Sequence, residues 1–401
     1  MRETTVAFLS ASGEMGGAER ALLDLLASLR DAAPDWSLCL IIPRDGPLRR
    51  EAAALGVATI VVPFPPALER LGDSSGRGRA MRRVLSALPA TARYARRLRT
   101  VLHEIAPRIV HTNGFKMHVL GMLASPRGTP VVWHVHDYVT SRPIMKRVMR
   151  LLARRVAVAL AISRSIAADL RLACGPSMRV QTMYNAVDLV RYAPTGVALQ
   201  LDELGGMPVA SPDTVRVGLV ATFARWKGHE TFLRVIASLP SELNVRGYVV
   251  GDGIYRTDHS QHTLAELRTL ASTLSLGNRI AFTGHVADTA AAYRGLDVVV
   301  HASTSPEPFG LVIAEAMACG RAVVVSASGG AAELVRPGVD ALAYPAGDAL
   351  ALAECIRRLA SSPLERARLG GEARRSAEQR FDRRRLATEL LSTYRALMPV
   401  A

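Results

Sequence analysis

The chain has 401 residues, which is enough for two domains with separate cores. Its composition, 49% hydrophobic and 21% charged residues, is that of a globular enzyme and excludes a disordered chain. The formal net charge of +15 favours an anionic partner, although basic side chains spread over solvated helix faces would give the same excess.

The first half of the chain alternates short apolar runs with helical patterns. Residues 4–10 predict a strand, and the glycine-rich turn Gly13–Gly17 then leads into a helix. One face of that helix carries Ala21, Leu22, Leu25, Leu26 and Leu29. Further strands are predicted at 38–43, 58–64, 108–113, 130–136, 158–163 and 180–185. Runs that are apolar on both faces indicate a parallel sheet covered by helices.

The second half repeats this alternation. Strands are predicted at 215–222, 246–253, 279–284, 297–303 and 321–328, with helices at 310–319 and 347–360. We therefore predict an α/β protein with two Rossmann-like, doubly wound domains that face each other across a cleft.

The domain boundaries follow from a break in the pattern. Residues 193–214 are rich in Gly, Pro and Ser and lack periodicity. We predict a first domain at 1–195, a linker at 196–213 and a second domain at 214–380. A helical segment at 381–401 is expected to pack back on the first domain.

The cysteines and the longest apolar runs bear on the compartment. The four cysteines lie far apart and have no zinc-binding spacing. The apolar run near the N-terminus is too short for a signal-peptide core, and no run approaches the roughly 20 apolar residues of a membrane span. We expect reduced thiols and a cytoplasmic protein.

The segment from Ser303 to Gly320 is the most informative part of the chain. It follows a predicted strand and opens a helix, at the sheet edge where α/β proteins bind ligands. The amides of Phe309, Gly310 and Leu311 are expected to point out of the helix N-terminus, which is an anion site suited to phosphate.

Two carboxylates flank this expected phosphate site. Glu307 precedes the helix, and Glu315 lies five residues past Gly310, about 7–8 Å along the axis. Glu307 could reach a sugar hydroxyl and Glu315 a ribose hydroxyl. Alternatively, Glu307 caps the helix and Glu315 is a solvated helix residue.

The spacing of Glu307 and Glu315 resembles the E-x7-E signature of retaining GT-B glycosyltransferases of family 4. Other short segments match the family in the same order along most of the chain. They are Gly16–Glu19, Val132–Asp137, Asn185–Asp188, Lys227–Glu230, Val250–Gly253, Phe282–Gly284 and Gly329–Glu333.

The resemblance implies a role for each matching residue. The first domain would bind the acceptor, with Gly16 and Gly17 against the donor diphosphate, and the second domain would bind a UDP- or GDP-sugar. Lys227 would neutralise the diphosphate, Glu307 would orient the transferred sugar, and Glu315 would bind the ribose. The remaining donor contacts would be Gly251, Gly253, Phe309, Gly310 and Leu311.

A histidine is also expected over the sugar, and the His-Val-His run offers two. Alternation places His134 and His136 on the same strand face, so both stay open. His136 is favoured because Asp137 follows it, as in the family's His-Asp pattern.

One position departs from the family. Many members carry an arginine five residues before the lysine, where this chain has Thr222. Arg225, two residues before Lys227, either replaces it as a phosphate ligand or is only exposed. No Asp-x-Asp motif stands in a metal-binding context, and the family generally needs no divalent ion.

Two basic stretches, 77–99 and 142–155, interleave arginines with apolar residues. Such a pattern fits a helix on an anionic membrane, or a core-facing helix with a solvated basic face. A nucleic-acid partner is disfavoured because aromatic residues are only 5% and no reader motif occurs.

We therefore expect a metal-independent retaining hexosyltransferase that uses a nucleoside-diphosphate sugar. Its acceptor is expected to be a glycan, a lipid-linked sugar or a small molecule, with possible contact to the inner face of the membrane. The alternatives are a nucleotide-sugar 2-epimerase of the same architecture and a non-catalytic membrane-surface binding protein.

Overall fold

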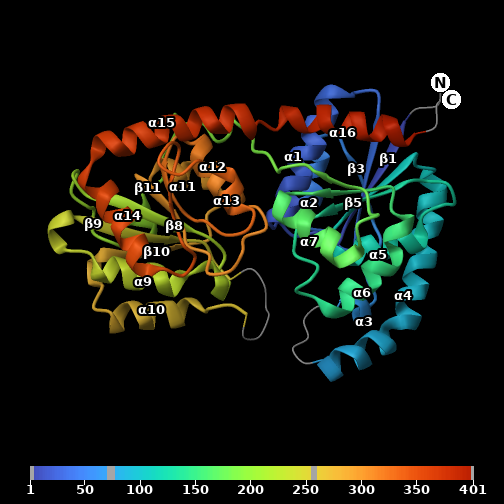
Figure 1. The fold of residues 1–401 in the computed structure, drawn as a ribbon, viewed down its shortest axis with the longest axis horizontal. Coiled ribbons are helices and arrows are strands. Elements are labelled where there is room, and N and C mark those ends of the chain that lie inside the picture. Colours follow the sequence, from blue (N-terminus) through green and yellow to red (C-terminus); the bar gives the residue numbers. More distant parts are fainter. Residues whose placement is uncertain (1–3, 70–76, 254–259, 399–401) are drawn as a thin grey trace. The chain divides into compact units, whose positions relative to one another are not determined.

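The computed structural model describes residues 4–69, 77–253 and 260–398, and in residues 77–85 the backbone alone. The chain divides into two compact units (Figure 1). The N-terminal unit comprises Met1–Ala186 and Arg383–Ala401, and the C-terminal unit comprises Val187–Asp382. No helix in the described part of the chain is long and apolar enough to cross a membrane.

The N-terminal unit is built on a parallel sheet in the order β3-β2-β1-β4-β5-β6-β7. Its strands are β1 (Thr5–Ser10), β2 (Ser37–Ile42), β3 (Ala58–Val61), β4 (Ile109–Asn113), β5 (Val131–Val135), β6 (Val158–Ala161) and β7 (Val180–Thr182). Its helices are α1 (Gly17–Ala32), α2 (Pro47–Ala54), α3 (Pro66–Glu69), α4 (Arg77–Ile105), α5 (Phe115–Ala124), α6 (Pro143–Leu152), α7 (Arg164–Cys174) and α16 (Arg384–Leu397), with the 3-10 turn η1 (Ala153–Arg155).

The C-terminal unit has a second parallel sheet in the order β10-β9-β8-β11-β12-β13. Its strands are β8 (Val215–Val220), β9 (Val245–Val250), β10 (Ile280–Gly284), β11 (Val298–His301), β12 (Ala322–Ser326) and β13 (Leu342–Tyr344). Its helices are α8 (Leu201–Leu204), α9 (His229–Ser238), α10 (Leu264–Thr273), α11 (Thr289–Arg294), α12 (Leu311–Ala318), α13 (Ala331–Leu334), α14 (Ala349–Ser361) and α15 (Pro363–Arg380). Short 3-10 turns are η2 (Arg225–Lys227), η3 (Ser241–Leu243) and η4 (Gly277–Arg279).

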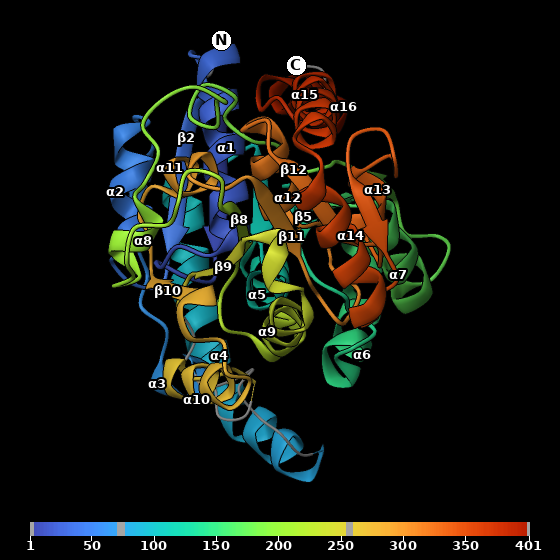
Figure 2. The same cartoon turned by 90° about the vertical axis from the view of Figure 1, so that its left-hand side faces the viewer.

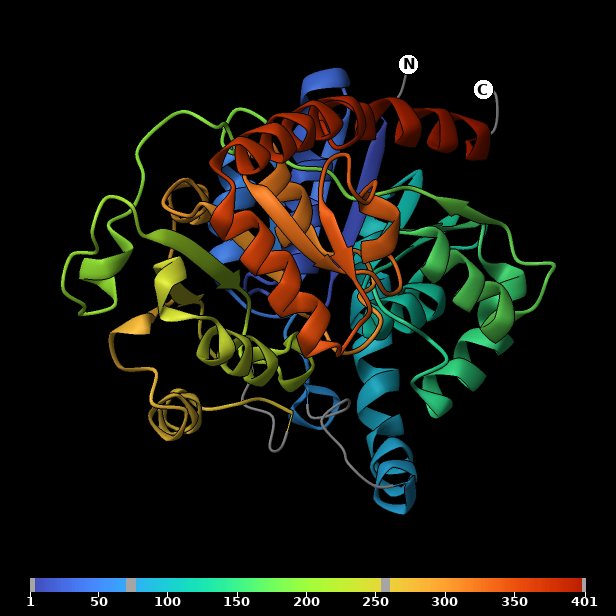
Figure 3. The same cartoon turned by 60° about the vertical axis from the view of Figure 1, so that its left-hand side comes forward.

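Each unit buries its own apolar core. The predicted apolar face of α1 is confirmed, since Leu22, Leu25, Leu26 and Leu29 are fully buried. They pack with β1, β2 and the C-terminal helix α16, which contacts α1 (Figure 1). In the C-terminal unit α14 packs beside α9 (Figures 2 and 3). Helices on the sheets explain why strands such as β4, β5 and β11 are buried along their whole length.

The boundary between the units differs from the expected linker. The boundary between the two units lies between Ala186 and Val187, so residues 196–213 belong to the C-terminal unit. Asp202 of α8 pairs with Arg246 of β9 at 2.6 Å, and the Leu199 amide donates to the Ala291 carbonyl at 3.0 Å. A segment without periodicity thus becomes ordered through side-chain contacts that pattern analysis does not detect.

Several elements of the C-terminal unit were absent from the predicted set, among them β13 and α15. β13 has only three residues and pairs with β12 at the sheet edge. α15 spans Pro363–Arg380, is rich in arginine, and has the Ser362 side chain as its N-cap. Such a short strand and such a polar helix carry little periodic signal.

Candidate active site

The order of the strands along the C-terminal sheet reverses between β8 and β11. This position is therefore the switch point of the sheet. Ligands of doubly wound sheets bind outside the carboxyl ends of the strands at such a switch point. The loops after β8 and β11 meet there, and the Thr304 amide donates to the Trp226 carbonyl at 2.8 Å.

A glycine makes this meeting of loops possible. Gly228 has φ +78°, and a Cβ atom there would lie 1.9 Å from the Ala302 carbonyl oxygen. No side chain fits such an approach, and the left-handed conformation disfavours one as well. Gly228 therefore sets the position of Lys227, its neighbour.

Lys227 and Glu307 form the central contact of the site. Lys227 Nζ donates to Glu307 Oε2 at 2.7 Å, and the two side chains are only 18% and 8% exposed. The ammonium also lies 4.0 Å from the centroid of the Trp226 ring. The Glu307 amide donates to the Ser328 carbonyl, and its carbonyl accepts from Gly330, so that its backbone is fixed to the loop after β12.

Two further side chains contact the same carboxylate oxygen. Ser303 Oγ donates to Glu307 Oε2 at 2.8 Å, and His301 Nε2 lies 3.0 Å from it. Burial by itself raises the pKa of Glu307, but Lys227 and His301 outweigh burial and hold this pKa well below its ordinary value. Glu307 is therefore an oriented, ionised carboxylate.

The helix that follows this loop begins one position later than expected. Gly310 is the N-cap of α12, with φ +98°, and Leu311 is the first helical residue. Phe309 precedes the cap, and its buried ring lies 6.1 Å from the Phe381 ring. The first amides of the helix are thus those of Leu311 and Val312.

Glu315 lies one turn after Leu311 within α12. Its side chain is 8% exposed, which excludes the alternative of a solvated helix residue. The fully buried Tyr293 hydroxyl of α11 donates to Glu315 Oε2 at 2.9 Å. Burial, and then the Glu315 carboxylate, raise the pKa of Tyr293 well above its ordinary value, so the phenol stays protonated as a donor.

The two glycines after β9 lie at the neighbouring strand end. Gly251 has φ +138°, and a Cβ there would lie 2.0 Å from the Ala221 carbonyl, so only glycine lets β9 end so close to β8. The exposed Gly253 amide donates to Asp252 Oδ1 at 2.7 Å.

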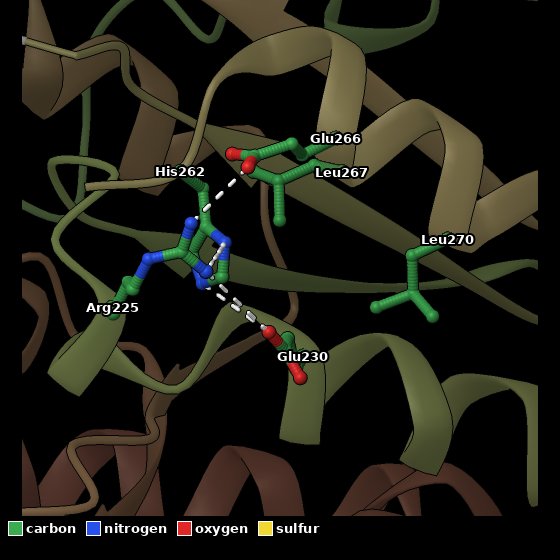
Figure 4. A pocket seen from close by; sticks show the side chains of 6 residues that line it. All are labelled: Arg225, Glu230, His262, Glu266, Leu267 and Leu270. Carbon is green, nitrogen blue, oxygen red and sulfur yellow. Dashed lines mark hydrogen bonds and ion pairs between the residues drawn. The ribbon is translucent and has the colours of Figure 1, made fainter. Parts of the chain in front are cut away.

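Arg225 contacts carboxylates rather than an open anion site. Its guanidinium lies 3.1 Å from Glu266, 4.0 Å from Glu230 and 3.2 Å from His262 Nδ1. These side chains and two leucines, Leu267 and Leu270, line a pocket of about 250 Å³ (Figure 4). Two carboxylates therefore already offset much of the charge of Arg225.

The N-terminal unit has its own switch point, between β1 and β4. Gly16 caps α1 and Gly17 begins it, so the helix N-terminus opens at the end of β1. The Asn113 side chain, at the end of β4, donates to the Ala18 carbonyl at 3.3 Å and ties the two loops together.

The two candidate histidines differ in burial. His134 lies within β5 at 1% exposure, and neither ring nitrogen has a partner among the described residues. His136 follows the strand, is half-buried, and has its ring centroid 4.2 Å from that of His134. Burial lowers the pKa of His136 to about 3, so its imidazole is neutral.

Two sequence families match the chain, one over each half. "Glycosyl transferase 4-like domain" matches residues 16–186, and "Glycosyl transferases group 1" matches residues 210–376. A D-inositol 3-phosphate glycosyltransferase of Xylanimonas cellulosilytica is 30% identical over 307 residues, which cover 71% of each chain. The chain belongs to the GT4-type glycosyltransferases of the GT-B fold.

Other similar proteins support the same family assignment. The N-acetyl-alpha-D-glucosaminyl L-malate synthase of Bacillus anthracis is 24% identical over 63% of each chain. Among solved structures, Anabaena Alr3699/HepE in complex with UDP-glucose superposes with a TM-score of 0.81 at 26% identity, covering 98% of this chain and 99% of that one. The expected fold class and enzyme class are confirmed, and sugar transfer replaces the epimerase and non-catalytic alternatives.

Sequence reasoning missed three residues of the candidate site: Tyr293, His301 and Ser303. His301 and Ser303 lie in the last three positions of the predicted strand 297–303, and this place at a strand end was their only signal. Tyr293 lies 22 positions before Glu315 and has no spacing that links the two.

Proposed function

We propose that this glycosyltransferase moves a hexosyl group from a nucleoside-diphosphate sugar to an acceptor hydroxyl, with retention at the anomeric carbon. The observation that carries the proposal is the Lys227–Glu307 pair at the C-terminal switch point, next to the N-terminus of α12. The crystal structures of HepE with UDP and with UDP-glucose support a UDP-sugar as the first donor to test.

In the proposed site, each group has one task. Lys227 and the Leu311 amide bind the donor diphosphate, where negative charge develops as the sugar leaves. The Glu307 carboxylate accepts a hydrogen bond from a sugar hydroxyl, and Glu315 accepts one from the ribose. Gly251, Gly253 and Gly310 let the donor approach the backbone, and the buried Phe309 ring packs the same loop.

The proposed chemistry keeps the nucleophile and the leaving group on one face of the sugar. The bond from the anomeric carbon to the diphosphate oxygen breaks, and the bond to the acceptor oxygen forms on the same face. The hydroxyl proton passes to the departing phosphate oxygen. Lys227 stabilises that oxygen as its charge grows.

The phosphate contact is assigned to Lys227 and withdrawn from Arg225. The partners of Arg225 are Glu230, Glu266 and His262, which turn its guanidinium towards α9 and α10 (Figure 4). This leaves Lys227 to make the phosphate contact without the family arginine, whose position is occupied by Thr222.

We retain three residues of the N-terminal unit as proposals. Gly16 and Gly17 contact the diphosphate, and His136 contacts the transferred sugar. Between the two histidines His136 is favoured, because it follows the carboxyl end of β5 whereas His134 lies within the strand.

The proposed acceptor is anionic. D-inositol 3-phosphate and L-malate, named in two relatives, are both negatively charged, and this chain carries a net charge of +15. The first acceptors to test are therefore inositol phosphate, malate and phosphorylated or lipid-linked glycans.

Helix α6 is the candidate membrane contact of this protein. We propose that the protein binds its lipid-linked acceptor at the inner face of an anionic membrane. Met149 and Leu152 are buried in the unit, whereas Leu151 is 79% exposed. Arg147 and Arg150 lie beside it, and no acidic residue occurs from Tyr138 to Ala168. Sedimentation with phosphatidylglycerol vesicles tests this, and binding that Leu151→Glu leaves unchanged overturns it.

The donor site is tested by thermal shift with UDP, GDP and ADP and their sugars, on wild type and Glu315→Ala. A ligand at about 100 times its Kd adds roughly 2.7 kcal/mol of stability. One nucleotide should raise Tm selectively, and less in the variant. No shift with any nucleotide refutes the donor site.

Two further measurements test the chemistry. Chelation by EDTA should leave turnover unchanged, since Lys227 and α12 provide the positive charge. The anomeric proton coupling of the product, read by NMR, should equal that of the donor, whereas inversion overturns the proposed mechanism.

A further inference from the structure

In the proposed site, the Glu307 carboxylate and the donor diphosphate both require the ammonium of Lys227. Its Nζ lies 2.7 Å from Glu307 Oε2, and the proposed function also directs it to the donor diphosphate. An ammonium that turns towards a diphosphate weakens its contact with the carboxylate. Since Glu307 is only 6% exposed, water cannot replace that contact, and burial would favour the protonated acid.

Two donors other than Lys227 contact the same oxygen of Glu307. Ser303 Oγ donates to Oε2 at 2.8 Å, and His301 Nε2 lies 3.0 Å from Oε2 and 3.0 Å from Ser303 Oγ. Because the serine hydrogen points to Glu307, its oxygen can accept from His301. The histidine tautomer with hydrogen on Nε2 satisfies both contacts.

The backbone of these two donors is held by the next strands of the sheet. The Ser326 hydroxyl of β12 donates to the Ser303 carbonyl at 2.5 Å. The Tyr344 hydroxyl of β13 lies 3.3 Å from the His301 carbonyl, which accepts from it. His301 ends β11, and both donors are at most 3% exposed, so they are attached to the rigid part of the unit rather than to a mobile loop.

We propose that His301 and Ser303 are positioning residues, which hold the Glu307 carboxylate ionised and in place while Lys227 contacts the donor diphosphate. This role rests on the function proposed above. It predicts that the affinity for the nucleotide sugar depends on His301 and Ser303. The affinity for the nucleotide without the sugar should not depend on them.

The test is calorimetric titration of the full-length protein with UDP and UDP-glucose, or with GDP and GDP-mannose if thermal shift selects guanine. At pH 7, Ser303→Ala and His301→Leu should weaken binding of the nucleotide sugar about tenfold and change nucleotide binding less than about twofold. At pH 5.5 the loss should grow, since Glu307 with fewer donors takes up a proton more readily. His301→Gln retains an N–H donor and should recover most of the affinity.

Ser305→Ala is the matched control, because Ser305 is an exposed serine of the same loop. It should bind both ligands as wild type does. Equal losses for nucleotide and nucleotide sugar, or a wild-type pH dependence in Ser303→Ala and His301→Leu, overturn the positioning role. Wild-type protein that binds no nucleotide or nucleotide sugar refutes the proposed function itself.

Discussion

The two switch points of this glycosyltransferase have the same backbone topology and different electrostatics. In the N-terminal unit, β4 carries His111, β5 carries His134, His136 follows β5, and His118 of α5 stacks on Trp133. Burial lowers the pKa of each of these histidines, so they are neutral. In the C-terminal unit, the corresponding loops carry a lysine and a glutamate that form an ion pair.

The difference shows what decides the charge of a buried group. His134 is surrounded by rings and has no hydrogen-bond partner among the described residues, so desolvation dominates. Glu307 is equally enclosed, but an ammonium and two other donors contact its Oε2. A fold shared by two units therefore fixes where side chains meet, and the residues at those positions fix whether the site attracts an anion.

The largest expected effect comes from acid. A histidine whose folded pKa lies below its ordinary value of about 6.5 stabilises the fold above that pH, and this stabilisation is lost as pH falls towards the folded value. At pH 5, each of His111, His118 and His134 should cost the N-terminal unit up to about 2 kcal/mol. Glu307 responds in the same direction but at lower pH, because its stabilisation is lost only as pH falls below its ordinary pKa of about 4.5. In the C-terminal unit, burial lowers the pKa of His229 to about 3, so this residue adds one comparable loss of stability. Burial also lowers the pKa of His262, which adds a further loss.

Urea unfolding at pH 7 and pH 5 measures this difference. Trp36 and Trp133 report on the N-terminal unit and Trp226 on the C-terminal unit, so a Trp226→Phe variant follows the first unit alone. The midpoint of the N-terminal unit should fall further. Equal shifts in both units contradict the comparison.

Removal of the cation at the C-terminal switch point should reduce turnover next most strongly. Lys227→Ala should lower kcat about 100- to 1000-fold, because it removes the charge that meets the leaving diphosphate. Arg225→Ala, its matched control, should change kcat less than about threefold, since two carboxylates already partner that guanidinium. Similar losses in both variants would return the phosphate role to Arg225.

Glycine substitutions in the two units should differ in cost. Gly228→Ala places a Cβ 1.9 Å from a backbone oxygen and should destabilise the C-terminal unit by about 3 kcal/mol or more. Gly114→Ala, in the loop after β4, has φ +90° but meets only Ala11 Cβ at 3.6 Å, and should cost about 1 kcal/mol. Chemical unfolding of both variants gives the two values. A Gly228→Ala protein as stable as Gly114→Ala would disprove the close approach of the two loops.

The smallest expected effect concerns Glu315. Tyr293→Phe removes only the hydroxyl that donates to this carboxylate, and it should weaken UDP binding about three- to tenfold with Tm nearly unchanged. Tyr344→Phe, which removes another hydroxyl of the same unit, should leave UDP binding within twofold. Unchanged UDP affinity in Tyr293→Phe removes Tyr293 from the donor site.

Much of this molecule could be predicted from local pattern. The alternation of apolar runs gave the two parallel sheets, and the apolar face of α1 is buried as expected. Glu307 and Glu315 are recognisable because both lie in one short strand–turn–helix segment. β13 was missed, since three residues at a sheet edge have no period to detect.

The amino-acid sequence by itself determined the fold class, the family and the segment that contains the proposed donor site, because these depend on periodicity and on spacing along the chain. Only the tertiary structure decided which side chains share that site. Tyr293 reaches Glu315, and Lys227 reaches Glu307, across 22 and 80 positions of sequence. Such contacts depend on strand order and on a glycine that lets two loops touch, and neither leaves a spacing that can be read along the chain.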